Sequence, residues 1–90
     1  MNRIDFHEVD FSKITIIDNY NYHNEEYHSY NLEFRIEEYP SESFLVCISV
    51  WDEEWNVGRI YQMRKKTHYV FDDELKEKFI IGLKKVLALS

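Results

Sequence analysis

Hydrophobic and polar residues alternate along several stretches of the chain, and the period changes near the C-terminus. The alternation is clearest over residues 30–39, where Tyr, Leu, Phe and Ile occupy every second position and Asn, Glu or Arg stand between them. This pattern is typical of an antiparallel strand with one face on the core and the other in water. The sequence therefore predicts a strand over residues 30–39, which ends at Pro40.

Residues 44–51 form the least polar stretch of the chain and contain no charged residue. β-Branched and aromatic residues are frequent in it, as they are in strands. Because successive side chains of a strand point to opposite faces, the stretch divides into two rows. One row consists of Phe44, Val46, Ile48 and Val50, and the other consists of Leu45, Cys47, Ser49 and Trp51. A strand with so few polar side chains is predicted to lie in the middle of a sheet.

The N-terminal part of the chain predicts one further strand. Residues 1–10 fit neither period and are expected to be an irregular or short helical lead-in. Residues 11–18 are expected to form a strand that places Ile14 and Ile16 on one face. Residues 18–28 contain turn-forming Asn and Asp but no aliphatic side chain, so they are expected to form a long hairpin loop.

The segment after residue 50 predicts an acidic turn and a fourth strand. The turn covers residues 51–58, which carry three consecutive acids between two Trp residues. The strand is expected over residues 59–69, with Tyr61 and Met63 facing inward. Because the alternation fails near Arg64, an irregularity such as a bulge is expected there.

The period becomes helical after residue 72. Asp72 or Asp73 is expected to cap the helix, and Glu74 favours the positive end of the helix dipole. An apolar stripe about half the circumference wide follows. It consists of Leu75, Phe79, Leu83, Val86 and Leu87, with Ile80 and Leu89 at its margins. The predicted fold is α+β: a four-stranded antiparallel meander (ββββ) with one C-terminal helix packed on one face.

Length and composition indicate a single domain over residues 1–90, with 44% hydrophobic residues for one core. No run of about 18 apolar residues and no signal-peptide pattern is found, so a cytoplasmic protein is expected. Cys47 is the only cysteine and is expected to fill space in the core. Residues with AT-rich codons (Phe, Tyr, Met, Ile, Asn, Lys) number 37, which favours a low-GC bacterium or one of its phages as the source.

Charge is distributed unevenly along the chain. The net charge is −6, but residues 1–56 carry −10 and residues 57–90 carry +4. Such asymmetry is an argument about partners rather than about fold. It predicts that the acidic part of the surface meets a basic partner.

No pattern in the sequence indicates a reaction. The two glycines, Gly58 and Gly82, are too far apart for a phosphate-binding loop, and no nucleophile elbow or His-Glu-x-x-His motif is present. His23, Glu25, Glu26 and His28 share one segment, but their spacing fits no standard metal site. We therefore expect no catalytic residues, no metal and no cofactor.

Tyrosines and acids crowd the same part of the chain, and this is the strongest functional signal. Tyr gives a large contact area at low entropic cost and is frequent in protein interfaces. The predicted partner-binding residues are Tyr20, Tyr22, Glu25, Glu26, Tyr27, Glu33, Glu37, Asp52, Glu53 and Glu54. The leading hypothesis is a non-catalytic module that occludes the surface of a basic or nucleic-acid-handling protein, as inhibitors, immunity proteins and phage anti-defence proteins do.

Two alternatives stay open. Basic and aromatic side chains on an open sheet are the parts that bind single-stranded nucleic acid. The residues with this character are Arg59, Tyr61, Arg64, Lys65 and Lys66. The third hypothesis is a self-assembling or structural subunit, for which Ile81 and Ala88, outside the main helical stripe, are candidate contacts.

Overall fold

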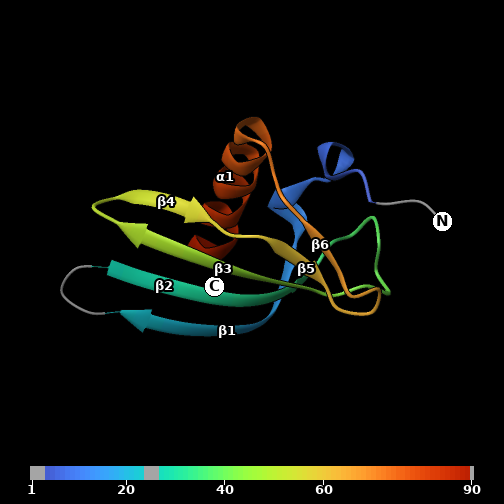
Figure 1. Ribbon diagram of the computed structural model, residues 1–90, viewed down its shortest axis with the longest axis horizontal. Helices are drawn as coiled ribbons and strands as arrows, with labels where there is room; N and C mark the ends of the chain where they lie inside the picture. Colours follow the sequence, from blue (N-terminus) through green and yellow to red (C-terminus); the bar gives the residue numbers. More distant parts are fainter. Residues whose placement is uncertain (1–3, 24–26, 90) are drawn as a thin grey trace.

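The chain folds into a six-stranded antiparallel sheet with one long helix against one of its faces (Figure 1). The computed structural model describes residues 4–23 and 27–89. Its elements are η1 (Phe6–Glu8), η2 (Phe11–Lys13), β1 (Thr15–His23), β2 (Tyr27–Arg35), β3 (Phe44–Trp51), β4 (Glu54–Val57), β5 (Ile60–Gln62), β6 (Thr67–Tyr69) and α1 (Asp73–Leu89). The strand order is β1-β2-β3-β5-β6, and β4 pairs with β3. The α+β class is confirmed, but the prediction of four strands is wrong.

Strand β3 is the central strand that its sequence predicted. It pairs with β2 along its whole length on one edge, and with β5 and then β4 on the other. Phe44 and Ile48 are fully buried on the inner face, whereas Leu45 and Trp51 are exposed on the outer face. Cys47 belongs to the outer row and is exposed, so the prediction that it fills the core is wrong. Only the row that faces α1 is covered.

Helix α1 begins where the sequence predicted. The Asp72 carboxylate accepts a hydrogen bond from the Leu75 backbone N–H at 2.8 Å, which is an N-cap contact. Phe79 and Leu83 are fully buried on the inner face of the sheet, while Ile81 is exposed. The predicted apolar stripe is therefore the face by which α1 covers the sheet.

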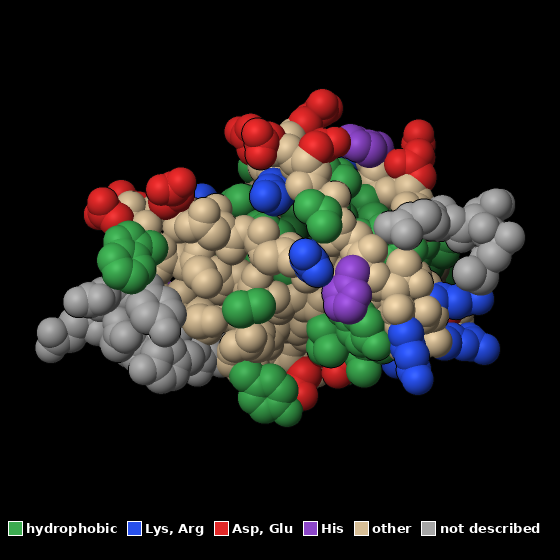
Figure 2. Space-filling view, in the orientation of Figure 1, with side chains coloured by type: hydrophobic (Ala, Val, Ile, Leu, Met, Phe, Trp, Pro, Cys, Tyr) green, Lys and Arg blue, Asp and Glu red, His purple; other side chains and the backbone are tan. Residues whose placement is uncertain are grey.

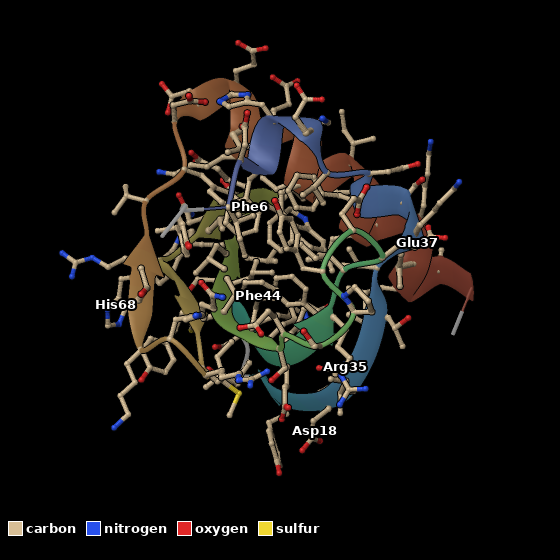
Figure 3. All side chains as sticks on the ribbon, turned by 90° about the vertical axis from the view of Figure 1, so that its right-hand side faces the viewer. Phe6, Asp18, Arg35, Glu37, Phe44 and His68 are labelled. Atoms are coloured by element: carbon tan, nitrogen blue, oxygen red, sulfur yellow. The ribbon has the colours of Figure 1, made fainter. Side chains whose placement is uncertain are left out.

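Two short 3-10 turns complete the core between the helix and the sheet. Each is capped by an aspartate side chain, Asp5 before η1 and Asp10 before η2. The Phe6 ring lies edge-on to Phe44 of β3, with centroids 5.7 Å apart, and the Phe11 ring lies edge-on to Phe79 of α1 at 5.1 Å. Figure 3 shows Phe6 and Phe44 inside this aromatic layer. The predicted lead-in thus supplies large core side chains.

Two predicted loops are shorter than expected, whereas β1 starts later than predicted, at Thr15, and β2 ends earlier than predicted, at Arg35. The prediction of a long loop over residues 18–28 is wrong, because β1 runs to His23 and β2 starts at Tyr27. The acidic turn over residues 51–58 is also wrong, because β4 begins at Glu54 and only two residues connect it to β3. Cross-strand pairing overrides the weak strand preference of these polar residues.

The predicted fourth strand over residues 59–69 is wrong as well. It is a hairpin of β5 and β6, in which Gln62 pairs with Thr67. The four residues between them form the turn, and Lys66 adopts a positive φ of 50° there. The failed alternation near Arg64 thus marks a chain reversal and not a bulge.

Two bulges change which residues face outward. In β1 the pairing slips between Ile16 and Asp18, so Ile16 faces the core while Asp18 pairs with Glu33 on the outer face. A bulged strand has one extra residue opposite its partner, and each following side chain therefore changes face. As a result, Tyr20 lies on the outer face and is 67% exposed.

The second bulge lies between β4 and β5. Ile48 pairs with Val57, but Leu45 pairs with Tyr61, so one extra residue is accommodated between the two pairs. Gly58 sits in the bulge and donates its N–H to the Cys47 carbonyl at 3.0 Å. Because the phase shifts here, Ile60 and Gln62 are buried and Tyr61 and Met63 are not. The predicted inward orientation of Tyr61 and Met63 is wrong for this reason.

Charged side chains are unevenly distributed over the surface. The principal extents are 44 × 25 × 23 Å. The β3–β4 turn lies at one end, where β1 also ends and β2 begins, and the β5–β6 turn lies toward the other end (Figure 1). Acidic side chains gather at the first end and around the start of α1, while Lys and Arg gather near the β5–β6 turn (Figure 2). None of the helices in the described residues has the length and apolar character that crossing a membrane requires.

Candidate functional site

The outer face of the sheet carries a continuous row of side chains across five strands. The pairings place Asp18 of β1, Glu33 of β2, Leu45 of β3, Tyr61 of β5 and His68 of β6 side by side. The row runs from two carboxylates at one edge to an aromatic pair at the other. The Tyr61 and His68 rings lie 4.7 Å apart with a tilt of 40°. Figure 3 shows Asp18 and His68 pointing away from the core.

A groove follows this row on the outer face. Its volume is about 460 Å³, which lies within the range of small-molecule sites, roughly 300–1,000 Å³. We call it the outer groove and define it by its lining residues: Tyr20, Asn31, Leu32, Glu33, Leu45, Val46, Cys47, Arg59, Tyr61 and His68. Leu45 and Cys47, both exposed, form an apolar floor between polar walls.

Both bulges direct a side chain into the outer groove. The bulge in β1 places Tyr20 on the groove side, and the bulge between β4 and β5 does the same for Arg59. Bulges that re-aim side chains are frequent beside functional sites. The two walls of the groove therefore depend on departures from regular strand geometry.

The outer groove is electrostatically polarised. Asp18 raises the pKa of Tyr20 above its ordinary value, first by a hydrogen bond between the side chains and then by its negative charge, and Glu33 adds to the effect. On the opposite wall Arg59 is exposed, and among the described residues no carboxylate lies within 4.0 Å of its guanidinium. One wall is thus negative and the other positive.

A second surface lies at the end of the molecule that carries the β3–β4 turn, and we call it the acidic end. It is defined by Trp51, Asp52, Glu53 and Glu54, with Tyr27 of β2 paired to Trp51 in the backbone register. Trp51 is 54% exposed. Asp52 and Glu53 have φ values of 52° and 65°, the pattern of a type I′ turn, which Asn and Gly favour instead.

The structure brings some of the predicted partner-binding residues together and separates others. Asp52, Glu53 and Glu54 share the acidic end, whereas Tyr20 and Glu33 line the outer groove. The backbones of Tyr22 and Tyr27 belong to β1 and β2 near the acidic end. Glu25 and Glu26 lie outside the described residues. Glu37 lies beyond the far end of β2, on the other side of the molecule from His68 (Figure 3).

The basic residues of the alternative hypothesis are also divided. Arg59 and Tyr61 line the outer groove. Arg64, Lys65 and Lys66 are exposed in the β5–β6 turn instead of lying along one strand. Arg64 lies 3.7 Å from a Glu42 carboxylate oxygen, so part of its charge is compensated.

Sequence reasoning did not select several residues of the outer groove. Leu45 and Cys47 were assigned to the row opposite Phe44, but neither row was identified as the outer one, and Cys47 was wrongly expected in the core. Asn31 and His68 were not selected, because their proximity to the groove depends on pairing between strands. Among the described residues, no group of three or more His, Cys, Asp or Glu side chains has an arrangement that could hold a metal ion.

Comparisons with protein-family models, with curated proteins and with solved structures each gave no match. The surfaces of this chain are therefore the basis for inferring its function.

Proposed function

We propose that the protein is a small acidic binding module that occludes a basic surface of a partner protein, in the manner of inhibitors, immunity proteins or phage anti-defence proteins. The observation that supports this most directly is the acidic end, where three consecutive carboxylates flank an aromatic ring that is 54% exposed. An aromatic anchor surrounded by charged groups is a common arrangement in protein interfaces. The charges speed and orient the encounter, and the aromatic ring supplies buried area.

The strained turn gives independent support. Positive φ values cost non-glycine residues of order 1 kcal/mol each, and Asp52 and Glu53 both adopt them. Strain of this kind is found at functional sites, where the side chain is needed despite its cost. Asn and Gly would form the same turn with less strain, but they would remove the two carboxylates.

Affinity capture from a low-GC bacterial lysate tests the proposal. The bait is the full chain, and the test variant is Asp52→Asn/Glu53→Gln/Glu54→Gln. The matched control, Glu8→Gln/Glu74→Gln/Glu77→Gln, removes the same charge from exposed positions elsewhere. We expect a basic protein to be retained by the wild type and the control and lost by the test variant. Equal loss with both variants would mean that net charge, and not the acidic end, retains the protein.

Binding of single-stranded nucleic acid is the second candidate function. It is favoured by the exposed basic side chains of the β5–β6 turn, Arg64, Lys65 and Lys66. They follow Arg59 and Tyr61 of the outer groove in the sequence. The test is the salt dependence of binding to a labelled dT oligonucleotide. The second candidate predicts affinity that falls steeply with salt and is lost in Arg64→Glu/Lys65→Glu, whereas the first predicts no oligonucleotide binding at low salt.

Self-assembly is the third proposal, with the exposed Ile81 and Ala88 of α1 as contacts. Mass measurement in solution over a range of concentrations tests it.

A further inference from the structure

The outer groove offers a set of contacts that the proposed acidic end does not use. It has a cation on one wall, a carboxylate on the other, an apolar floor between them and an aromatic pair beside the floor. Arg59 and Glu33 have no ion-pair partner among the described residues. A ligand that complements the groove must therefore be planar and apolar in its middle, anionic at one end and a hydrogen-bond donor at the other.

Strand geometry gives the spacing of the two positions that anchor this ligand. Glu33 and Tyr61 are separated by two strand spacings, and Arg59 precedes Tyr61 by two residues. At ~4.8 Å per strand and ~3.3 Å per residue, the backbones of Glu33 and Arg59 are roughly 12 Å apart. A free amino acid does not fit, because its α-ammonium and carboxylate groups are attached to the same carbon, and lysine and arginine, which carry a remote donor, have no planar apolar group in the middle. A nucleotide fits this requirement, because the base amine and the phosphate stand at opposite ends of the molecule.

We propose that the outer groove binds a free nucleoside monophosphate that carries an exocyclic amine. The phosphate pairs with the Arg59 guanidinium, whose planar fork matches phosphate oxygens. The base lies over Leu45 and Cys47 beside the Tyr61 ring, and its amine donates to the Glu33 carboxylate. A longer nucleic acid is disfavoured, because the net charge of −6 repels a polyanion far more than a single phosphate. This inference is independent of the function proposed for the acidic end.

Amide chemical-shift titrations of the full chain provide the test, with cytidine 5′-monophosphate as the probe. Cytidine lacks the phosphate, and uridine 5′-monophosphate has a carbonyl where cytosine has the amine. We expect amide shifts at Leu45, Cys47 and Tyr61 with cytidine monophosphate. Either comparison ligand should bind roughly tenfold or more weakly, because each lacks one hydrogen bond to a charged side chain. The ligand should also slow alkylation of the exposed Cys47 by iodoacetamide.

Two variants and one control assign the contacts. Arg59→Gln should lower the affinity for cytidine monophosphate roughly tenfold or more. Glu33→Gln should remove the preference for cytidine monophosphate over uridine monophosphate. Arg64→Gln makes the same change in the β5–β6 turn and should have no effect, because Arg64 does not line the groove. Circular dichroism confirms that each variant is folded.

Three results would overturn the inference. The first is that millimolar cytidine monophosphate neither shifts the amide signals of the groove nor slows the alkylation of Cys47. The second is an equal loss in Arg64→Gln and Arg59→Gln, which would indicate diffuse attraction of phosphate. The third is binding of a cytidine hexanucleotide more than tenfold tighter than the mononucleotide, which would assign the groove to a nucleic-acid strand.

Discussion

Gly82 of α1 lies directly against the backbone of Phe11 in η2. A Cβ added to Gly82 would meet the carbonyl carbon and the Cβ of Phe11 at 2.6 Å, closer than real Cβ contacts. The contact lets η2 approach the helix, and it lets the Phe11 ring reach Phe79. The glycine thus determines how the N-terminal turns close the core.

Gly82→Ala is therefore expected to destabilise the protein. Alanine gains about 1 kcal/mol in helix propensity over glycine, but overpacking against a fixed backbone costs typically 1–3 kcal/mol. We expect a net loss, because the clashing atoms belong mainly to the Phe11 main chain. Urea denaturation should show a lower midpoint with an unchanged m-value. Lys85→Ala, at an exposed position of the same helix, should leave the midpoint nearly unchanged.

Glu53→Gly is expected to stabilise the fold and weaken partner binding. Glycine relieves the positive φ of 65° at this position, a gain of about 1 kcal/mol. The same change removes a carboxylate from the acidic end. The melting temperature should thus rise, while the amount of partner captured should fall. Glu54→Gly, within β4, should instead lower stability by about 0.5–1 kcal/mol. A Glu53→Gly protein that melts earlier than the wild type would contradict the account of the strained turn.

Tyr69→Phe is expected to destabilise the protein by about 1–2 kcal/mol. The Tyr69 hydroxyl donates to the Gln62 side-chain oxygen at 2.9 Å, and the Gln62 amide donates to Glu42 at 2.7 Å. All three residues are buried, so removing the hydroxyl leaves the Gln62 oxygen without its donor. Tyr61→Phe on the outer face is the matched comparison and should change the unfolding free energy little. Equal effects of the two substitutions in urea would argue against the buried chain of hydrogen bonds.

The phenol of Tyr20 is expected to titrate above its ordinary pKa of 10.0, because Asp18 and Glu33 favour the neutral form. A raised pKa in the folded state means that the contribution to stability is present below pH 10 and is lost as the pH rises through the folded pKa. Carbon-13 shifts of the Tyr20 ring should follow this titration. Asp18→Asn should bring the midpoint down toward 10.0, and a midpoint that does not move would exclude Asp18 as the cause.

Alternation and helical periodicity predicted the elements that bury a continuous apolar row. Strand β3 and helix α1 were predicted almost to the residue, because burial of Phe44, Ile48 and Phe79 fixes which face is covered. The β5–β6 turn was missed because Met63, Arg64, Lys65 and Lys66 include none of the usual turn residues. Strand β4 was missed for the opposite reason, since Asp52, Glu53 and Glu54 resemble a loop, although β3 supplies them with a pairing edge.

The sequence alone determined the class of the fold, the division of the central strand into two rows, the amphipathic helix and the uneven charge. These follow from local patterns, because each depends on residue types at fixed spacing along the chain. Tertiary structure decided the strand number, the two bulges and the meeting of Glu33, Tyr61 and His68 on one face. A bulge adds one residue without requiring an unusual residue type, yet it reverses every following side chain. The outer groove therefore depends on the registers between strands, which no local pattern specifies.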